Sequence, residues 1–252
     1  MNLKKKLRKP KATIGSWITL PDCSVAEIMA KQGFDWLVID MEHSAIEISQ
    51  AQELIRVIEL SGCVPLVRVG ENNPNLIKRI MDAGAHGVVV PMVNTAEDAR
   101  KAVDAVKYPP KGKRGVGLAR AQGYGLSFEK YKRWVNTNSI VVVQIEDIEA
   151  ISNLEEILKV QGVDASIIGP YDLSASLGYP GEFGKSKMKA AIKRYQRTCK
   201  KMKKPSGIHV IPPDAKKLSE RKKEGYQFIA FSLDTLFFGE KLKQELKGIG
   251  KA

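Results

Sequence analysis

The sequence predicts a single (β/α)8 TIM barrel that takes up the whole chain, residues 1–252. Eight short apolar runs alternate along it with amphipathic segments, a pattern typical of parallel sheets covered by helices. No Pro/Gly-rich linker separates two domains, and about 250 residues is the usual size of one such barrel. An open, doubly wound sheet is the less favoured alternative, because no G-x-G-x-x-G motif follows the first apolar run.

Four strands, each followed by a helix, are predicted in the first half of the chain, after a basic and flexible arm at residues 1–11. The strands are short and rich in β-branched residues, which suits burial on both faces. They cover residues 12–20, 35–40, 64–69 and 87–90. The helices between them carry end signals, such as a capping-box pattern at residues 24–27 and the cap and first-position proline of Asn73-Pro74.

The second half of the chain begins with residues 107–139, the longest stretch without a clear period. Loops of this length in compact domains tend to be functional. Four further strands are predicted at residues 140–145, 165–168, 207–210 and 226–231. Apolar residues at helical spacing predict helices at residues 150–158, 185–204 and 215–225, and Leu236, Phe237, Leu242 and Leu246 mark a final one.

Two acidic residues, Glu146 and Asp172, follow neighbouring strands of the predicted sheet. A right-handed strand–helix–strand crossover brings the ends of both strands to the same edge. Two carboxylates at one edge, with little positive charge beside them, are typical of a site for a hard divalent cation. The alternative is that each acid caps the helix that follows it.

Other polar residues are predicted to gather at the same edge, where barrel enzymes place their chemistry. They are Asp40 and His43 after the second strand, Arg68 at the end of the third, His209 on the seventh and Asp234 beyond the eighth. His86 begins the fourth strand, at the opposite end, and is interpreted as structural. No lysine lies in or directly after a predicted strand, which argues against a Schiff-base aldolase.

The net charge of +13 is concentrated in two segments. Residues 1–11 hold six Lys or Arg and no acid, and residues 185–204 hold ten and no acid. Within 185–204 the apolar residues trace one face, so we interpret the cations as the solvent face of a helix. Such charge steers anionic substrates or binds polyanions weakly.

Location is predicted from what the sequence lacks. No apolar run is long enough to span a bilayer, and the basic N-terminus has no apolar signal segment. Cys23, Cys63 and Cys199 are scattered and form no C-x-x-C pair, which is typical of reduced thiols. We therefore expect a cytoplasmic protein.

With these residues the sequence resembles the HpcH/HpaI aldolase family, the metal-dependent class II pyruvate aldolases. The resemblance runs from residue 15 to residue 234 and depends on motifs in a fixed order and spacing. These motifs are FDWLVID at 34–40 followed by Glu42-His43, PMV at 91–93, YPP at 108–110 with RGVG at 114–117, VQIE at 143–146, and IGPYDLS at 168–174.

The resemblance implies roles for particular residues. Glu146 and Asp172 would bind Mg²⁺, Mn²⁺ or Co²⁺, and the ion would hold a 2-oxo acid. His43 would be the catalytic histidine, Asp82 the acid that orients it, and Arg68 a catalytic and substrate-binding residue beside the keto oxygen. Substrate contacts are further implied for Gln144, Gly169, Pro170, Tyr171 and Asp172. Family members are commonly hexamers whose C-terminal helices are exchanged between subunits.

The reaction implied by the resemblance is reversible aldol cleavage of a 4-hydroxy-2-oxo acid to pyruvate and an aldehyde, as in 2-dehydro-3-deoxyglucarate or 4-hydroxy-2-oxoheptanedioate aldolases. The loop at residues 118–125 is expected to touch the aldehyde half. One alternative is a citrate-lyase-β-like lyase that acts on a CoA thioester. Another, of a different class, is a non-catalytic polyanion-binding protein that uses the two basic segments. No specific nucleic acid and no membrane partner is expected.

Overall fold

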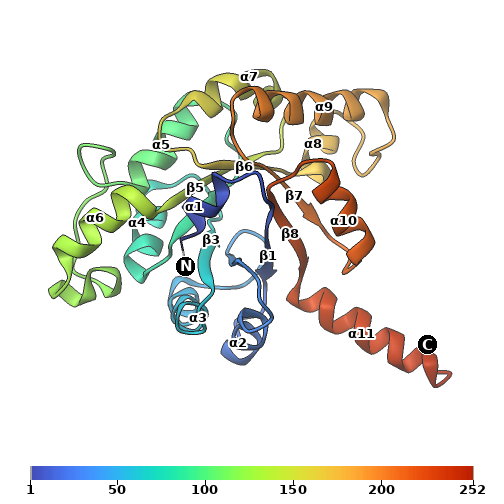
Figure 1. Ribbon diagram of the computed structural model, residues 1–252, viewed down its shortest axis with the longest axis horizontal. Coiled ribbons are helices and arrows are strands. Elements are labelled where there is room, and N and C mark those ends of the chain that lie inside the picture. Colours follow the sequence, from blue (N-terminus) through green and yellow to red (C-terminus); the bar gives the residue numbers. More distant parts are fainter. Residues whose placement is uncertain (1, 252) are drawn as a thin grey trace.

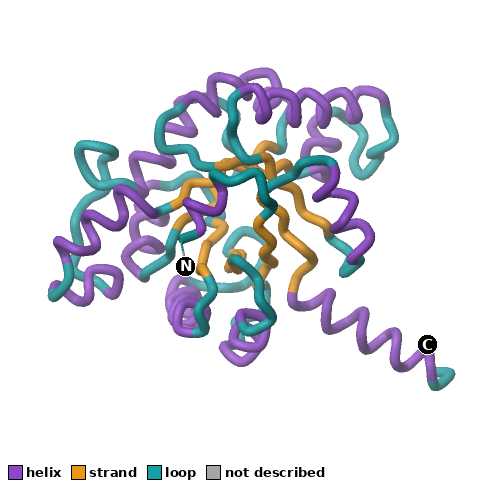
Figure 2. Tube along the Cα trace, in the orientation of Figure 1, coloured by secondary structure: helices purple, strands orange, loops and turns teal. Residues whose placement is uncertain are grey.

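Eight parallel strands close into one barrel in the computed structural model, which describes residues 2–251. The strands are β1 (Thr13–Ile18), β2 (Trp36–Asp40), β3 (Val64–Arg68), β4 (Gly87–Val90), β5 (Ile140–Ile145), β6 (Ala165–Ile168), β7 (Ser206–Val210) and β8 (Phe228–Leu233). Each pairs with the next, and β8 pairs with β1. The predicted barrel is therefore confirmed, with the strands inside and the helices around them (Figures 1 and 2).

The helices cover the outside of the barrel in chain order. They are α1 (Leu3–Leu7), α2 (Cys23–Ala30), α3 (Ile48–Leu60), α4 (Pro74–Ala83), α5 (Ala96–Val106), the 3₁₀ segment η1 (Arg120–Gly125), α6 (Phe128–Asn138), α7 (Ile148–Lys159), α8 (Pro170–Ser176), α9 (Ser186–Lys201), α10 (Ala215–Lys223) and α11 (Asp234–Gly248). Their apolar faces and the outward side chains of the strands form the larger core, and a smaller core fills the barrel interior.

The N-terminal arm differs from its prediction. Residues 3–7 form α1, and Leu3 and Leu7 are each 2% exposed because they pack with the interior residues Val64 and Ile140. Thus α1 plugs the N-terminal mouth of the barrel, opposite the ends of the strands that carry the polar residues. This packing could not be predicted from the basic N-terminal segment, because only two side chains of α1 are apolar and they lie four positions apart.

Two other local predictions need correction. The helix α2 is capped by Asp22, whose side chain accepts hydrogen bonds from the amides of Ser24 and Val25, so the capping-box pattern at 24–27 does not mark its start. The stretch 107–139 is not irregular throughout, because it contains η1 and the 11-residue helix α6. That helix buries Tyr131 and Val135, one turn apart, on an otherwise polar segment.

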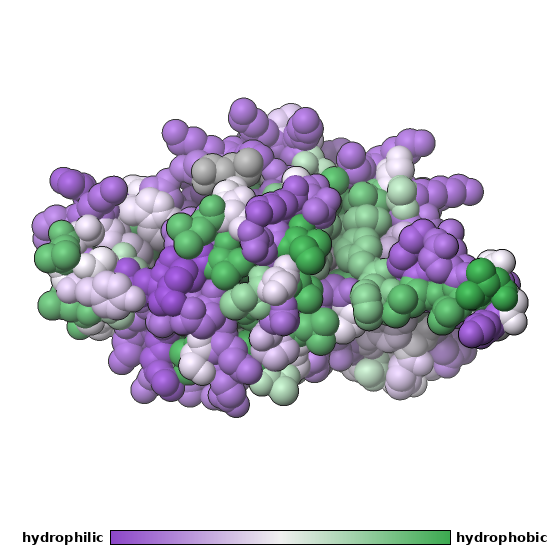
Figure 3. Space-filling model, turned by 90° about the horizontal axis from the view of Figure 1, so that it is seen from below, coloured by the Kyte–Doolittle hydropathy of each residue, from purple (hydrophilic) through white to green (hydrophobic). Residues whose placement is uncertain are grey.

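The last helix, α11, projects away from the barrel (Figure 1). The side chains of Phe238, Leu242 and Leu246, and that of Ile249 directly after the helix, are between 42% and 68% exposed. A row of hydrophobic side chains follows the projecting end of the molecule in the view from below (Figure 3). No helix among residues 2–251 has the length and apolar character needed to cross a membrane.

Candidate active site

Asp40 and Arg68 form the first fixed pair at the C-terminal edge of the barrel. They lie opposite each other on β2 and β3. The guanidinium of Arg68 donates two hydrogen bonds to the Asp40 carboxylate, from Nε at 2.9 Å and from Nη2 at 2.6 Å. It also lies 4.4 Å from the ring centroid of Trp17. These contacts fix the direction of Arg68, since a fork-like guanidinium matched to a carboxylate leaves little freedom.

The same carboxylate shapes the loop that carries His43. Asp40 Oδ1 accepts hydrogen bonds from the amides of Glu42 and His43 at 3.0 and 3.2 Å. The His43 side chain is 65% exposed and lies 3.9 Å from Glu42. The histidine is therefore held by its backbone while its ring stays accessible to a substrate.

Glu146 is 4% exposed at the end of β5. Its Oε1 accepts a hydrogen bond from the Met92 amide at 2.6 Å, and its Oε2 accepts one from Gln144 Nε2. The helix α7 is capped by the next residue, Asp147, whose side chain accepts from the amide of Glu149. Glu146 is thus not used as a cap, which removes the structural alternative for this acid.

Glu146 and Asp172 face a common space above Gly169. A side-chain carbon placed on Gly169 would lie 3.2 Å from Glu146 Oε2 and 3.5 Å from Asp172 Oδ2. The two carboxylates therefore converge on a space that is kept open by the absence of a side chain. No group of three His, Cys, Asp or Glu suited to a metal ion occurs among the described residues. Two carboxylates in this arrangement fit a divalent ion whose other ligands are water or substrate oxygens, as Mg²⁺ prefers.

Glu42 is a residue of this site that we did not assign from the sequence, although it lies in the Glu42-His43 motif. Burial raises its pKa to about 7, and the carboxylates of Glu146, Asp40 and Asp172 add to the rise, whereas Arg68 opposes it. Glu42 Oε2 lies 3.1 Å from Arg68 Nη1. The side chain thus faces the same space as the two acids of the proposed metal site.

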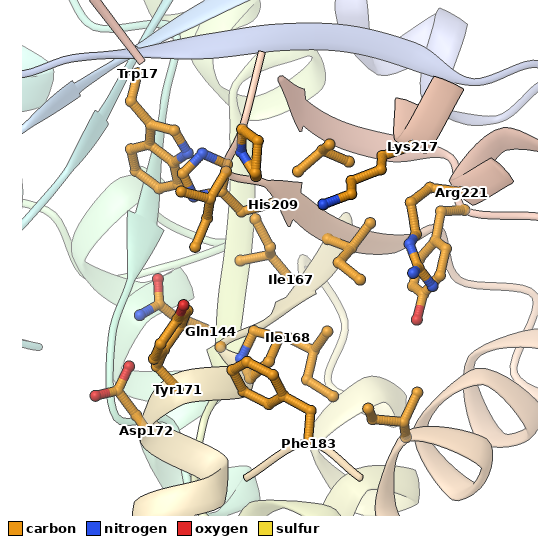
Figure 4. A pocket seen from close by; sticks show the side chains of 18 of the residues that line it. Trp17, Gln144, Ile167, Ile168, Tyr171, Asp172, Phe183, His209, Lys217 and Arg221 are labelled. Carbon is orange, nitrogen blue, oxygen red and sulfur yellow. The ribbon is translucent and has the colours of Figure 1, made fainter. Parts of the chain in front are cut away.

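Trp17 and His209 form the wall on the other side (Figure 4). Their ring centroids are 5.7 Å apart. The Trp17 indole N–H is buried without a hydrogen-bond partner in the described part of the chain, and Trp17 is one of the residues that line the cleft. His209 Nε2 lies 3.2 Å from the Ser232 carbonyl, and burial lowers the pKa of this histidine to about 4.

A cleft of about 480 Å³ lies beside these groups, and its lining includes Trp17, Arg68, Gln144, Tyr171, Asp172 and His209. It continues between the ends of β6 and β7 past Ile168 and Ile208. Figure 4 shows Gln144, Tyr171 and Asp172 at one end and Lys217 and Arg221 of α10 at the other. The cleft is thus polar and acidic at the rim, apolar along its middle and basic at its outer end.

Asp82 is not brought to His43 by any contact within the chain. Its carboxylate accepts hydrogen bonds from Arg114 Nη2 and from Gln122 Nε2. Together with the ion pair between Arg120 and Glu59, these contacts hold the loop at residues 114–126 against the outside of the barrel. This loop is not among the residues that line the cleft of its own chain, and its contact with the aldehyde half stays a prediction.

The remaining candidates have structural contacts. Asp234 accepts hydrogen bonds from the amides of Thr19 and Leu20 at 2.7 and 2.8 Å, so it ties β8 to the end of β1. His86 Nε2 lies 3.1 Å from Glu59, and its ring packs on Trp134 with centroids 4.9 Å apart. These contacts agree with the structural interpretation of His86.

Comparison with known proteins supports the same chemistry. The family model described as HpcH/HpaI aldolase/citrate lyase matches residues 13–239. The 2-keto-3-deoxy-L-rhamnonate aldolase of Escherichia coli (strain K12) is 38% identical over 245 residues, which are 96% of this chain and 91% of that protein.

Solved structures agree over nearly the whole chain. An HpcH/HpaI aldolase/citrate lyase family protein from Burkholderia cenocepacia J2315 superposes with a TM-score of 0.93 at 32% identity and covers 98% of both chains. An HpcH/HpaI aldolase from Desulfitobacterium hafniense DCB-2 has a TM-score of 0.90 at 30% identity, and covers 100% of this chain and 98% of that one.

Proposed function

The chain belongs to the HpcH/HpaI aldolase/citrate lyase family, and from this premise we propose that its substrate is a 2-keto-3-deoxy sugar acid, which it cleaves to pyruvate and an aldehyde. The enzyme is a carbon–carbon lyase of the class II aldolase type, and its reaction is the reversible aldol cleavage of a 4-hydroxy-2-oxo acid. The choice of a sugar acid follows the printed activity of the Escherichia coli relative.

Glu146 and Asp172 are the residues that would hold a divalent ion, because their oxygens converge above Gly169. Mg²⁺, Mn²⁺ and Co²⁺ all accept such carboxylate oxygens. When bound, the ion supplies Lewis-acid stabilisation of the negative charge that develops on the keto oxygen, an effect worth several kcal/mol. Gln144 keeps the Glu146 carboxylate in place through its amide.

Arg68 and the first turn of α8 would bind the 2-oxo acid. Arg68 donates to the keto oxygen while Asp40 holds its guanidinium in direction. The amides of Tyr171 and Asp172 belong to the first turn of α8, whose N–H groups have no partner within the helix, so they suit the substrate carboxylate. Pro170 has no N–H, and Gly169 leaves the space that the substrate enters.

His43 is the proposed general base. Its exposed ring lies 3.9 Å from Glu42, whose pKa is raised by burial and by the carboxylates of Glu146 and Asp172, and it would take the proton from the 4-hydroxyl as the carbon–carbon bond breaks. The electron pair of that bond forms the enolate of pyruvate, and the protonated His43 would give the proton to its C3 atom, so that condensation is the reverse of these steps. Trp17 and His209 form a wall that excludes water from the reacting carbon atoms.

The observation that supports this proposal most directly is the convergence of the two carboxylates, so the test removes them. We expect Glu146→Gln and Asp172→Asn each to lose tight Mn²⁺ binding in a calorimetric titration and at least about 10²-fold in kcat for pyruvate aldol formation. The matched control is Asp147→Asn, which changes a neighbouring acid that caps α7.

The Asp147→Asn control should keep both Mn²⁺ binding and aldolase turnover. Wild-type activity that persists after complete chelation would refute the metal assignment. An assay of pyruvate with a panel of aldehydes, followed by identification of the adducts, then identifies the acceptor half.

One observation favours the alternative of a CoA-thioester lyase. The outer end of the cleft carries Lys217 and Arg221, and cations there suit the phosphates of a long acyl carrier. The same purified enzyme should therefore be assayed with acyl-CoA substrates. Cleavage of a thioester substrate at a higher kcat/KM than any 2-oxo acid would favour this alternative.

Assembly and location complete the proposal. We infer a homohexamer in which the apolar face of α11 packs on a neighbouring barrel, since that face is exposed in the single chain. In such an assembly the loop at residues 114–126 and Asp82 would reach the site of another subunit. The three unpaired cysteines support a cytoplasmic location.

A further inference from the structure

The two basic segments of the sequence meet at one place in the fold, at the pole of the barrel opposite the active site. A cleft of about 440 Å³ there has six cations in its lining: Lys4, Arg8, Lys9, Lys200, Lys203 and Lys204. The first three come from α1 and the residues after it, and the others come from the last turn of α9 and the residues that follow it. Asp164 is the one acid among its lining residues.

Part of this charge has a structural use. Lys4 Nζ lies 2.8 Å from Asp164 Oδ1 and donates to the Ser139 carbonyl at 3.1 Å. Lys204 Nζ donates to the Val163 carbonyl at 2.5 Å. These two lysines therefore attach α1 and the turn before β7 to the bottom of the barrel, and the carboxylate that pairs with Lys4 also attracts Lys204 electrostatically.

The other four cations have no such use. Arg8, Lys9, Lys200 and Lys203 are exposed, and none of them forms an ion pair with a carboxylate among residues 2–251. Lys203 also has a φ of 53°, a left-handed conformation that costs a non-glycine residue about 1 kcal/mol or more. Like charges that crowd without counter-ions repel each other and favour an anion between them.

The floor of the cleft is formed by buried side chains and is not a flat, open surface. Leu7, Val163 and Cys199 are 1–2% exposed at its base, and Pro205 is buried beside them. The Gln227 side chain fixes the wall by donating to the Lys9 carbonyl at 2.9 Å. A concave, partly apolar floor under a ring of cations is suited to a small anion with an organic part, within the usual volume of ligand sites.

We propose that this cleft binds a small molecule that carries a pyrophosphate or triphosphate group, such as a nucleoside polyphosphate. A single phosphate monoester carries a charge of about −1.5 to −2 at pH 7, so a chain of phosphates matches four unpaired cations better than one phosphate does. The ligand bridges the residues after α1 to the end of α9, and so it stabilises the plug of the barrel. Extended nucleic acid fits less well, because the cations surround a cleft instead of following a stripe.

The test is a calorimetric titration of the full-length protein with pyrophosphate, ATP and inorganic phosphate at about 50 mM salt, where such contacts are not screened out. No divalent ion is added, because the phosphates would chelate it. We expect pyrophosphate and ATP to bind at least about tenfold more tightly than phosphate.

Two pairs of substitutions remove opposite sides of the cleft. Lys200→Gln with Lys203→Gln, and Arg8→Gln with Lys9→Gln, should each weaken pyrophosphate binding by about tenfold, the effect of about 1.4 kcal/mol. The matched control is Lys187→Gln with Lys189→Gln, which removes the same charge from the exposed face of α9, about 16 Å or more along the helix. The control should bind within about twofold of the wild type.

Three results would overturn the proposal. They are no binding by the wild type, an equal loss in the control pair, or tighter binding of a short DNA duplex than of ATP. Aldolase turnover should be unchanged in every variant, because the cleft lies at the other pole from Glu146 and Asp172. An experiment that finds no polyphosphate binding at this cleft is thus distinguishable from one that finds no aldolase activity.

Discussion

Gly169 keeps open the space between the carboxylates of Glu146 and Asp172, and its replacement tests that space directly. Its φ of −97° is allowed for any residue, so Gly169→Ala introduces only a methyl group. That carbon would stand 3.1 Å from Glu146 Cβ and 3.2 Å from its Oε2. We expect a loss of about tenfold or more in Mn²⁺ affinity, with an overpacking cost of about 1–3 kcal/mol in the free energy of unfolding.

Calorimetric metal titration and urea unfolding separate the two effects of Gly169→Ala. The matched control is Gly184→Ala, at a site with no atom within 4 Å of the added carbon. The metal assignment would be contradicted if Gly169→Ala folded stably and bound Mn²⁺ as the wild type does.

His209 predicts a pH dependence of stability. Burial lowers its pKa from 6.5 to about 4, so the folded protein holds the neutral ring while the unfolded chain takes up a proton first as the pH falls. This contribution is present above pH 6.5 and is lost as the pH falls to about 4. It amounts to about 1–3 kcal/mol.

The variant His209→Gln lacks the titrating group. We expect the difference in unfolding free energy between wild type and variant to shrink by that amount between pH 7 and pH 4, as measured by urea denaturation. A constant difference across this range would show that the ring is not held neutral. Metal should be chelated in both samples, so that ion binding does not contribute to the slope.

At the residue scale, the sequence predicted the positions of those site residues that lie at the end of a strand. Asp40, Arg68 and Glu146 end or follow predicted strands, and all three lie at the rim as expected. Glu42 and Trp17 were missed as site residues, because burial and an unpaired indole N–H appear only after folding. The cap of α2 at Asp22 was missed because a neighbouring serine gave a competing signal.

At the scale of elements, the predictions failed where a segment is polar but packed. The helix α6 and the plug α1 each bury only two side chains, so neither has a broad apolar face in the sequence. The sequence also did not indicate the ion pairs that direct the loop at residues 114–126 away from its own cleft, and the contact of this loop with the aldehyde half stays a prediction. Arg114 pairs with Asp82, 32 positions away in the sequence, and Arg120 pairs with Glu59, 61 positions away.

Asp82 is the anchor of that loop, and its charge is matched to the buried guanidinium of Arg114. Asp82→Asn leaves this guanidinium without its carboxylate, although Tyr131 still accepts a hydrogen bond from it at 2.9 Å. We expect a loss of about 3 kcal/mol or more in the free energy of unfolding. Urea denaturation measures it.

Asp104→Asn is the matched control for Asp82→Asn. It breaks a pair with Lys113, whose side chain is 82% exposed, and should cost less than about 1 kcal/mol. Equal, small losses in both variants would contradict the anchoring role. The kcat of the folded Asp82 variant separately tests whether this acid also orients His43 of a neighbouring subunit.

At the scale of the whole molecule, the barrel and its exposed last helix need different explanations. The barrel buries its apolar residues within one chain. The alternation of apolar runs with amphipathic segments along the sequence was therefore enough to predict it. In α11 the apolar residues recur at helical spacing, but only its first turns meet the barrel, through contacts such as that between Phe237 and Phe231. Beyond them Phe238, Leu242, Leu246 and Ile249 form an exposed stripe. Stripes of this kind mark protein–protein contacts.

Replacing part of that stripe with charge tests the proposed assembly. We expect Leu242→Glu with Leu246→Glu to lower the molar mass measured by light scattering after size-exclusion chromatography, because two buried carboxylates would cost more than the contact gains. Gln244→Glu with Lys247→Glu, on the opposite face of the same helix, should keep the mass of the wild type. If both pairs kept it, α11 would not form the subunit contact. Because Asp82 and the loop at residues 114–126 face away from their own cleft, we expect the dissociated variant also to lose affinity for the aldehyde while it still binds Mn²⁺.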